Sequence, residues 1–92
     1  MPKPLHSEQY RTFIQALRSL REDASVSQTA LAKRLGVEQT YVSKCETGVR
    51  RLDVVELRAW LRALGVGPSS FMATLDELLE APERPRRSIG RG

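Results

Sequence analysis

The chain is poor in the residues from which most enzyme active sites are built. Its 92 residues include one histidine, His6, and one cysteine, Cys45. His6 lies in a proline-flanked N-terminal stretch, so a structured core contains neither a Ser-His pair nor a multi-histidine metal site. No glycine-rich loop of the Walker or dinucleotide type occurs. We therefore expect no enzymatic activity, no cofactor and no metal.

Long hydrophobic runs are also missing. The longest unbroken apolar runs are two or three residues, so no segment is expected to cross a bilayer. There is no signal-peptide h-region near the N-terminus. A lone Cys45 cannot form an internal disulfide and suits a reducing compartment, which predicts a cytoplasmic protein without a membrane partner.

The positive charge is unevenly distributed. Fifteen Lys and Arg residues against eleven Asp and Glu residues give a formal net charge of +4, which suggests a polyanionic partner. Residues 1–80 carry eleven basic and ten acidic side chains, a net of +1, whereas residues 81–92 carry four arginines and one glutamate, a net of +3. Most of the excess therefore belongs to the C-terminal end.

Apolar residues recur at intervals of three and four, the spacing of amphipathic helices, and no strand pattern occurs. Capping and terminating residues predict five helices, over residues 7–24, 28–35, 39–47, 54–64 and 68–81. Ser7 and Ser27 are predicted N-caps, and Asp53 with Glu56 predicts a capping box. The sequence therefore predicts an all-α domain over residues 7–81, after an irregular lead (1–6) and before a disordered basic tail (82–92).

The second and third predicted helices are short and joined by only three residues. Gly36 opens this turn, where a positive φ is favourable for glycine, and Ala32 is small where two crossing helices approach closely. Val42 and Cys45 supply the inward contacts of the third helix. Two short helices joined in this way cross steeply, as in a helix-turn-helix unit.

The exposed face of the third helix carries side chains that can read DNA bases. Gln39 stands at its start, where a carboxamide can form a bidentate pair with adenine. Thr40 and Ser43 can add hydroxyl or methyl contacts, and Lys44 can reach a guanine edge or a phosphate from the same face. We expect these four residues to read base edges in the major groove.

Three further residues are expected to contact phosphates. Gln28 begins the second helix, where its amide and the positive end of the helix dipole suit an anion. Arg50 and Arg51 follow Gly48 just beyond the third helix, where they can clamp the backbone.

At this point the sequence resembles a known family, the Cro and phage-repressor type of DNA-binding domain, often called XRE-type. The resemblance covers roughly residues 10–80 and is carried by residues 26–66, VSQTALAKRLGVEQTYVSKCETGVRRLDVVELRAWLRALGV. Ser-Gln, Leu-Ala, Leu-Gly-Val, Val-Ser-Lys and Glu-x-Gly all fall at the family's spacing. The resemblance implies a five-helix, phage-repressor-like fold in which the second and third helices form the helix-turn-helix.

The resemblance also implies roles for individual residues. Gln28 would buttress Gln39 and touch a phosphate, and the base-reading assignments above would hold. Arg21, late in the first helix, would form a partly buried, structural ion pair with Glu46 of the Glu-x-Gly motif.

Three positions depart from the family pattern. Ser25 stands where a glycine usually follows the first helix, so that helix end is expected to be strained or differently capped. Cys45 replaces a larger aliphatic residue. Glu38 replaces a Ser or Thr cap before Gln39, which places a negative charge near the expected phosphates.

The last helix carries more apolar side chains than one small core must absorb: Phe71, Met72, Leu75, Leu78 and Leu79. Part of this face is expected to pair with a second copy. The resemblance then implies a prokaryotic or phage transcriptional regulator, a homodimeric repressor on a near-palindromic operator in double-stranded DNA. The alternative is an antitoxin-like or adaptor subunit whose last helix or tail binds a protein partner.

Overall fold

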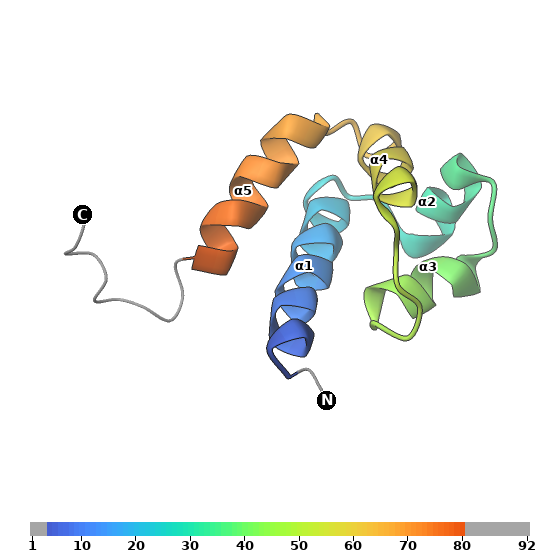
Figure 1. Ribbon diagram of the computed structural model, residues 1–92. Coiled ribbons are helices and arrows are strands. Elements are labelled where there is room, and N and C mark those ends of the chain that lie inside the picture. The colour runs from blue at the N-terminus through green and yellow to red at the C-terminus, as the bar shows by residue number, and fades with distance from the viewer. Residues whose placement is uncertain (1–3, 81–92) are drawn as a thin grey trace.

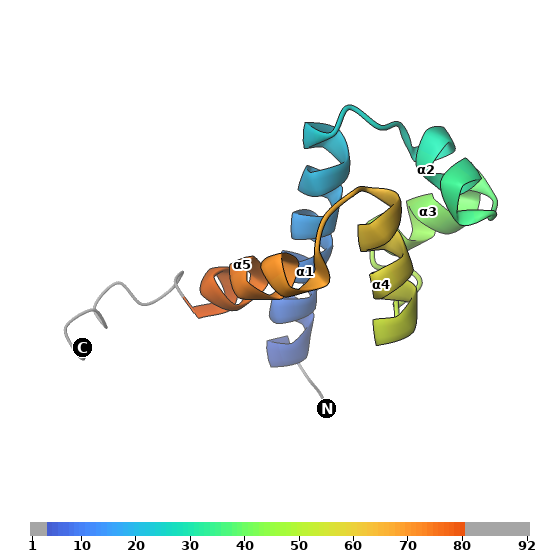
Figure 2. The ribbon, with the colours of Figure 1, turned by 90° about the horizontal axis from the view of Figure 1, so that it is seen from above.

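The computed structural model describes residues 4–80, with side chains from residue 8 onward, and the predicted tail (82–92) lies outside this range. The described residues form five helices and no strand: α1 (Pro4–Asp23), α2 (Gln28–Leu35), α3 (Gln39–Glu46), α4 (Val54–Ala63) and α5 (Pro68–Glu80). α2, α3 and α4 lie together on one side of α1, and α5 crosses α1 on the other (Figures 1 and 2). The all-α prediction is confirmed. None of these helices is both long and apolar enough to span a membrane.

α1 begins earlier than predicted. It starts at Pro4, so Ser7 lies inside the helix and does not cap it, and residues 4–6 of the predicted irregular lead are helical. Proline suits the first position of a helix because its fixed φ is already helical and its missing N–H has no partner there. The backbone restriction that a proline imposes falls on the residue before it.

α2 and the turn behind it have the predicted ends. The Ser27 hydroxyl accepts a hydrogen bond from the Ala30 N–H at 3.0 Å. Gly36 takes the left-handed conformation with φ 72°, and the Val37 N–H donates to the Ala32 carbonyl at 3.0 Å. This closed turn sets the angle at which α3 leaves α2.

α4 is fixed at both ends. The predicted capping box is present: Asp53 Oδ1 accepts from the Glu56 N–H at 2.8 Å, and Glu56 Oε1 accepts from the Asp53 N–H at 2.9 Å. At the other end, Arg34 from α2 donates to the Ala63 carbonyl at 2.9 Å. α4 is thereby tied to the helix-turn-helix.

The core lies between α1 and the other four helices. Trp60 is the largest fully buried side chain, and Ala32, Val42 and Cys45 are at most 3% exposed, as the close crossing of α2 and α3 requires. The buried cluster consists of Leu17, Val26, Leu31, Ala32, Val42, Cys45, Trp60, Leu61, Leu64, Phe71 and Leu75. One continuous core therefore includes all five helices.

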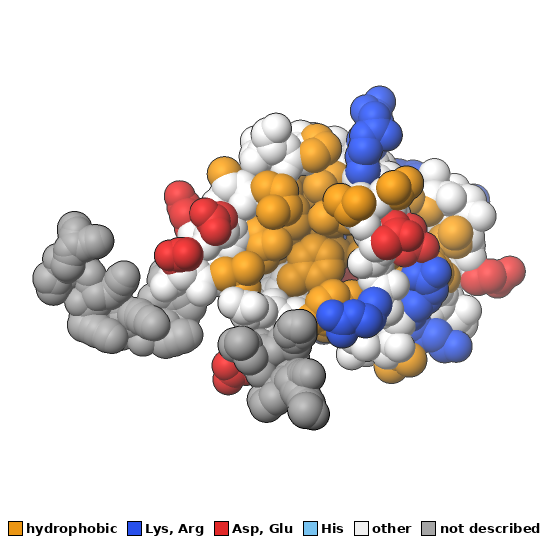
Figure 3. All heavy atoms as spheres, viewed as in Figure 1, with side chains coloured by type: hydrophobic (Ala, Val, Ile, Leu, Met, Phe, Trp, Pro, Cys, Tyr) orange, Lys and Arg blue, Asp and Glu red, His pale blue; other side chains and the backbone are white. Residues whose placement is uncertain are grey.

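α5 buries only part of its apolar face. Phe71 and Leu75 are buried, and Phe71 meets the edge of Phe13 from α1 with ring centroids 6.2 Å apart. Met72 and Leu78 remain 50% and 42% exposed. Figure 3 shows hydrophobic side chains gathered on the face shared by α1, α4 and α5.

Ser25, after the end of α1, has an unusual backbone conformation. Its φ is +59°, and it is the one non-glycine residue with positive φ in the described range. The Val26 N–H donates to the Arg21 carbonyl at 3.1 Å, so a serine adopts the left-handed turn that glycine most often makes at the end of a helix. The positive φ agrees with the expectation that this helix end is strained or differently capped.

Replacing Ser25 with glycine is expected to stabilise the domain by about 1 kcal/mol, because glycine adopts positive φ without the steric cost of a Cβ. Thermal unfolding followed by circular dichroism should show a rise of roughly 4–8 °C. Ser19→Gly, at an exposed position inside α1, should lower the stability by about 0.5 kcal/mol. Equal effects of the two substitutions would show that the Ser25 backbone is not strained.

Candidate nucleic-acid interface

α3 turns its polar side chains to solvent and its apolar ones to the core. Val42 and Cys45 are fully buried. Gln39, Thr40 and Lys44 are exposed and Ser43 is partly exposed, all on the outer side of the helix. The four predicted base-reading residues therefore share one accessible surface.

Gln39 is held in place by Gln28 at the start of α2. Gln39 Nε2 donates to Gln28 Oε1 at 2.6 Å, and Gln28 Nε2 donates in turn to Glu46 Oε1 at 2.9 Å. The buttressing contact that the family resemblance implies is present. It leaves the Gln39 carboxamide with its oxygen and one N–H available.

Beneath these glutamines lies a buried ion pair. Arg21 Nε donates to Glu46 Oε2 at 2.6 Å and Arg21 Nη2 donates to Glu46 Oε1 at 2.9 Å, with the two residues 8% and 7% exposed. Arg21 Nη1 also donates to the Val26 carbonyl at 2.9 Å. The hydrogen bonds with Glu46 raise the pKa of Arg21 above its ordinary value even though burial lowers it. Glu46 is thus neutralised inside the protein.

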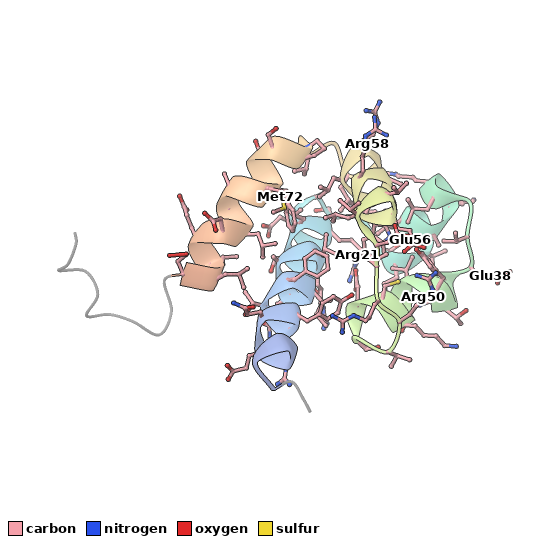
Figure 4. All side chains as sticks on the ribbon, viewed as in Figure 1. Arg21, Glu38, Arg50, Glu56, Arg58 and Met72 are labelled. Atoms are coloured by element: carbon pink, nitrogen blue, oxygen red, sulfur yellow. The ribbon has the colours of Figure 1, made fainter. Side chains whose placement is uncertain are left out.

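The loop between α3 and α4 holds Arg50 in a way that the sequence analysis missed. Its Nη2 and Nη1 atoms donate to the two oxygens of Glu56 at 3.0 and 3.3 Å (Figure 4). Its guanidinium lies 4.8 Å from the centre of the Tyr41 ring. The hydrogen bond from Arg50 lowers the pKa of Glu56, and the same bond raises that of Arg50. Arg50 therefore links the end of α3 to the start of α4, and its predicted phosphate contact is left to the N–H groups that Glu56 and the Arg51 carbonyl do not use.

Arg51 is placed differently. Its guanidinium lies 4.0 Å from the centre of the Tyr10 ring, and the Tyr10 hydroxyl accepts a hydrogen bond from the Leu52 N–H at 3.0 Å. Within the described range the Arg51 guanidinium has no hydrogen-bond partner. Of the two loop arginines, Arg51 keeps all its guanidinium N–H donors for another partner, whereas Arg50 already uses several on Glu56 and on the Arg51 carbonyl.

Glu38 precedes α3 as its N-cap residue, but its side chain makes no cap hydrogen bond. It is exposed and stands at the outer edge of the helix-turn-helix (Figure 4). Its charge is close to the surface that carries Gln39, as the sequence indicates.

The crossing of α2 and α3, the glycine turn and the buried pair beneath them define a helix-turn-helix domain. The chain belongs to the helix-turn-helix domain family, whose model matches residues 15–78. It is similar to an XRE-family like protein from Pseudomonas syringae pv. tomato, with 35% identity and a TM-score of 0.76 over 80% of this chain and 90% of that one. The XRE-type resemblance is thus confirmed.

Two further structures have similar folds. The clp gene regulator ClgR from C. glutamicum is 28% identical, with a TM-score of 0.67 over 82% of this chain and 92% of that one. The restriction-modification controller protein C.Esp1396I is 24% identical, with a TM-score of 0.70 over 77% of this chain and 94% of that one. This likeness concerns the fold alone. The comparison with curated proteins gives no match.

Substituting Glu46 with alanine should strongly destabilise the domain, by about 3–5 kcal/mol, because Arg21 would remain buried without a partner. The matched control is Glu22→Ala, which breaks the exposed ion pair with Arg18 at 3.1 Å and should cost at most about 1 kcal/mol. Urea denaturation measures both. The double variant Arg21→Met/Glu46→Leu should recover much of the loss, and a double variant as unstable as Glu46→Ala would contradict this account.

Proposed function

We propose that the chain is a transcriptional regulator that binds double-stranded DNA with α3 in the major groove and represses by occupying its operator. The observation that carries this proposal is the series of hydrogen bonds from Arg21 through Glu46 and Gln28 to Gln39. It fixes a carboxamide at the N-terminal end of α3, where a recognition helix contacts base edges.

The groups that Gln39 leaves available match adenine. A bidentate contact to adenine needs one acceptor for the N6 amino group and one donor for N7. Gln39 uses one amide hydrogen on Gln28 and keeps its oxygen and the second N–H. Because the amide is already oriented, little rotamer freedom is lost on binding. Adenine is therefore the proposed partner of Gln39.

The other proposed contacts extend along the same surface. Thr40, Ser43 and Lys44 would read neighbouring base edges from the outer side of α3. Arg51 and Gln28 would contact phosphates and set the register of the helix in the groove. Arg50 would join them through the guanidinium N–H groups that Glu56 leaves unbonded.

Gln39→Ala should change which sequences are bound, and Arg51→Ala should weaken binding to all sequences. The reason is that a base contact distinguishes sequences, whereas a phosphate contact does not. Selection of bound sequences from a random DNA pool and titrations at several salt concentrations measure the two effects. Arg51→Ala should reduce the salt slope by about 1. Uniform losses on every sequence for both variants would remove the base-reading proposal.

The proposed regulator acts as a homodimer. Exposed Met72 and Leu78 support this proposal, together with an apolar groove of about 560 Å³ between α1 and α5 that Ala16, Leu20, Phe71 and Leu78 help to line. A symmetric pair would place two recognition helices in successive major grooves, about 34 Å apart, on a near-palindromic site.

Met72→Glu should shift the protein from dimer to monomer in sedimentation velocity, because a charge would be desolvated in the apolar contact. Val55→Glu is the matched control, because Val55 is 71% exposed on α4 and lies outside the proposed contact. A wild-type protein that stays monomeric at 100-fold the concentration that saturates DNA would rule out the homodimer. Failure to bind duplex DNA even at low salt would instead favour a protein-binding adaptor.

A further inference from the structure

A hollow of about 380 Å³ lies where the first turns of α1 pass the end of α3. Its lining residues are Tyr10, Arg11, Ile14, Thr47, Gly48 and Arg51. Gly48 allows α1 to pass close to the end of α3, because its φ is +83° and a Cβ there would lie 3.3 Å from the Ile14 side chain. The hollow therefore lies between α1 and the residues that follow α3.

We propose that this hollow receives a phosphate of the DNA backbone between Arg11 and Arg51, which makes Arg11 of α1 a DNA-contacting residue. The proposal rests on the proposed function, because it assumes that α3 enters the major groove. It adds a second element, outside the helix-turn-helix, to the DNA-binding surface.

The orientation of Arg51 favours an anion. A guanidinium stacked on an aromatic ring uses its face, whereas its N–H donors lie in its plane and point outward. Arg51 stacks on Tyr10, which is itself anchored by the Leu52 N–H. The donors at its edge therefore stay available for an anion, on a platform that is already ordered.

Arg11 is a second positive charge at the hollow that no carboxylate of the described residues neutralises. It is exposed, and within the described range it has no ion-pair partner, although Glu8 stands three residues before it. Arg18, two turns further along α1, pairs with Glu22 at 3.1 Å. Two unpaired guanidinium groups at one hollow repel each other, and an anion between them removes that repulsion.

The carbonyls at the end of α3, next to the hollow, are largely hydrogen-bonded. The carbonyls that end a helix are negative and would repel a phosphate. Here Thr47 donates its N–H to the Ser43 carbonyl, Gly48 donates to the Cys45 carbonyl, and the Arg50 N–H donates to the Lys44 carbonyl at 3.1 Å. Three of the last four carbonyls of α3 thus accept hydrogen bonds, so they oppose an anion less.

The length of α3 matches the width of the major groove. α3 has eight residues, which gives a helix about 12 Å long. The major groove is about 12 Å wide. With the N-terminal end of α3 at the base edges, residues just beyond its C-terminal end come to the phosphates at the edge of the groove, and the hollow lies there.

The test compares Arg11→Gln with Arg18→Gln, two substitutions that remove the same charge from exposed positions of one helix. Binding of a random-sequence duplex is followed by fluorescence anisotropy at several salt concentrations. Arg11→Gln should reduce the slope of log K against log salt by about 0.9, and adding Arg51→Gln should reduce it by about 0.9 again. Arg18→Gln should leave the slope unchanged. Thermal unfolding verifies that each variant is folded.

The outcomes separate the two proposals. If the wild-type protein binds and Arg11→Gln has the same slope as Arg18→Gln, the phosphate site is refuted and the proposed function stands. If the wild-type protein binds no duplex at low salt, the proposed function is refuted and this site with it. A change in sequence preference for Arg11→Gln would also refute the proposal, because a phosphate contact is independent of sequence.

Discussion

The buried pair between Arg21 and Glu46 is the interaction on which the rest of the structure depends. Neither charge is stable in the core alone, so each holds the other in place. Through this pair α1 fixes the end of α3, and through Gln28 the same glutamate fixes the side chain of Gln39. A requirement of the core, neutralising a buried charge, therefore orients a group at the surface. Stability and the proposed recognition share one set of hydrogen bonds.

A nearly neutral domain can still offer DNA a basic surface, because placement matters more than net charge. Arg50 and Arg51 stack on Tyr41 and Tyr10, and Glu46 is neutralised internally. The acidic residues of α5, namely Asp76, Glu77 and Glu80, are exposed on the opposite side from α3 (Figures 1 and 3). The aromatic residues are few, yet two of them hold the loop arginines and a third, Trp60, fills the core.

Much of the fold could be predicted because its signals are local. Ser27, Gly36 and the Asp53 capping box each act within a few residues of themselves, and the structure has all three. The predicted start of α1 was wrong because Pro4 is compatible both with an irregular segment and with a helix that begins at this residue. The bond between Arg50 and Glu56 was missed because a capping glutamate gives no sign that its carboxylate has a second partner. The contacts of Gln28 with Gln39 and of Glu46 with Arg21 were predicted from the family resemblance, and the structure has both.

The sequence by itself determined five amphipathic helices, the glycine turn and a polar outer face on α3, because periodicity and capping need only neighbouring residues. Only the tertiary structure decided which charges are available. Arg50 and Arg51 are adjacent and chemically identical, and each lies over a tyrosine ring, yet only Arg50 is also bound by a carboxylate. Arg11 and Arg51, far apart in the sequence, likewise line one hollow. Such differences arise from packing between distant segments, where small changes in helix angle decide which side chains meet.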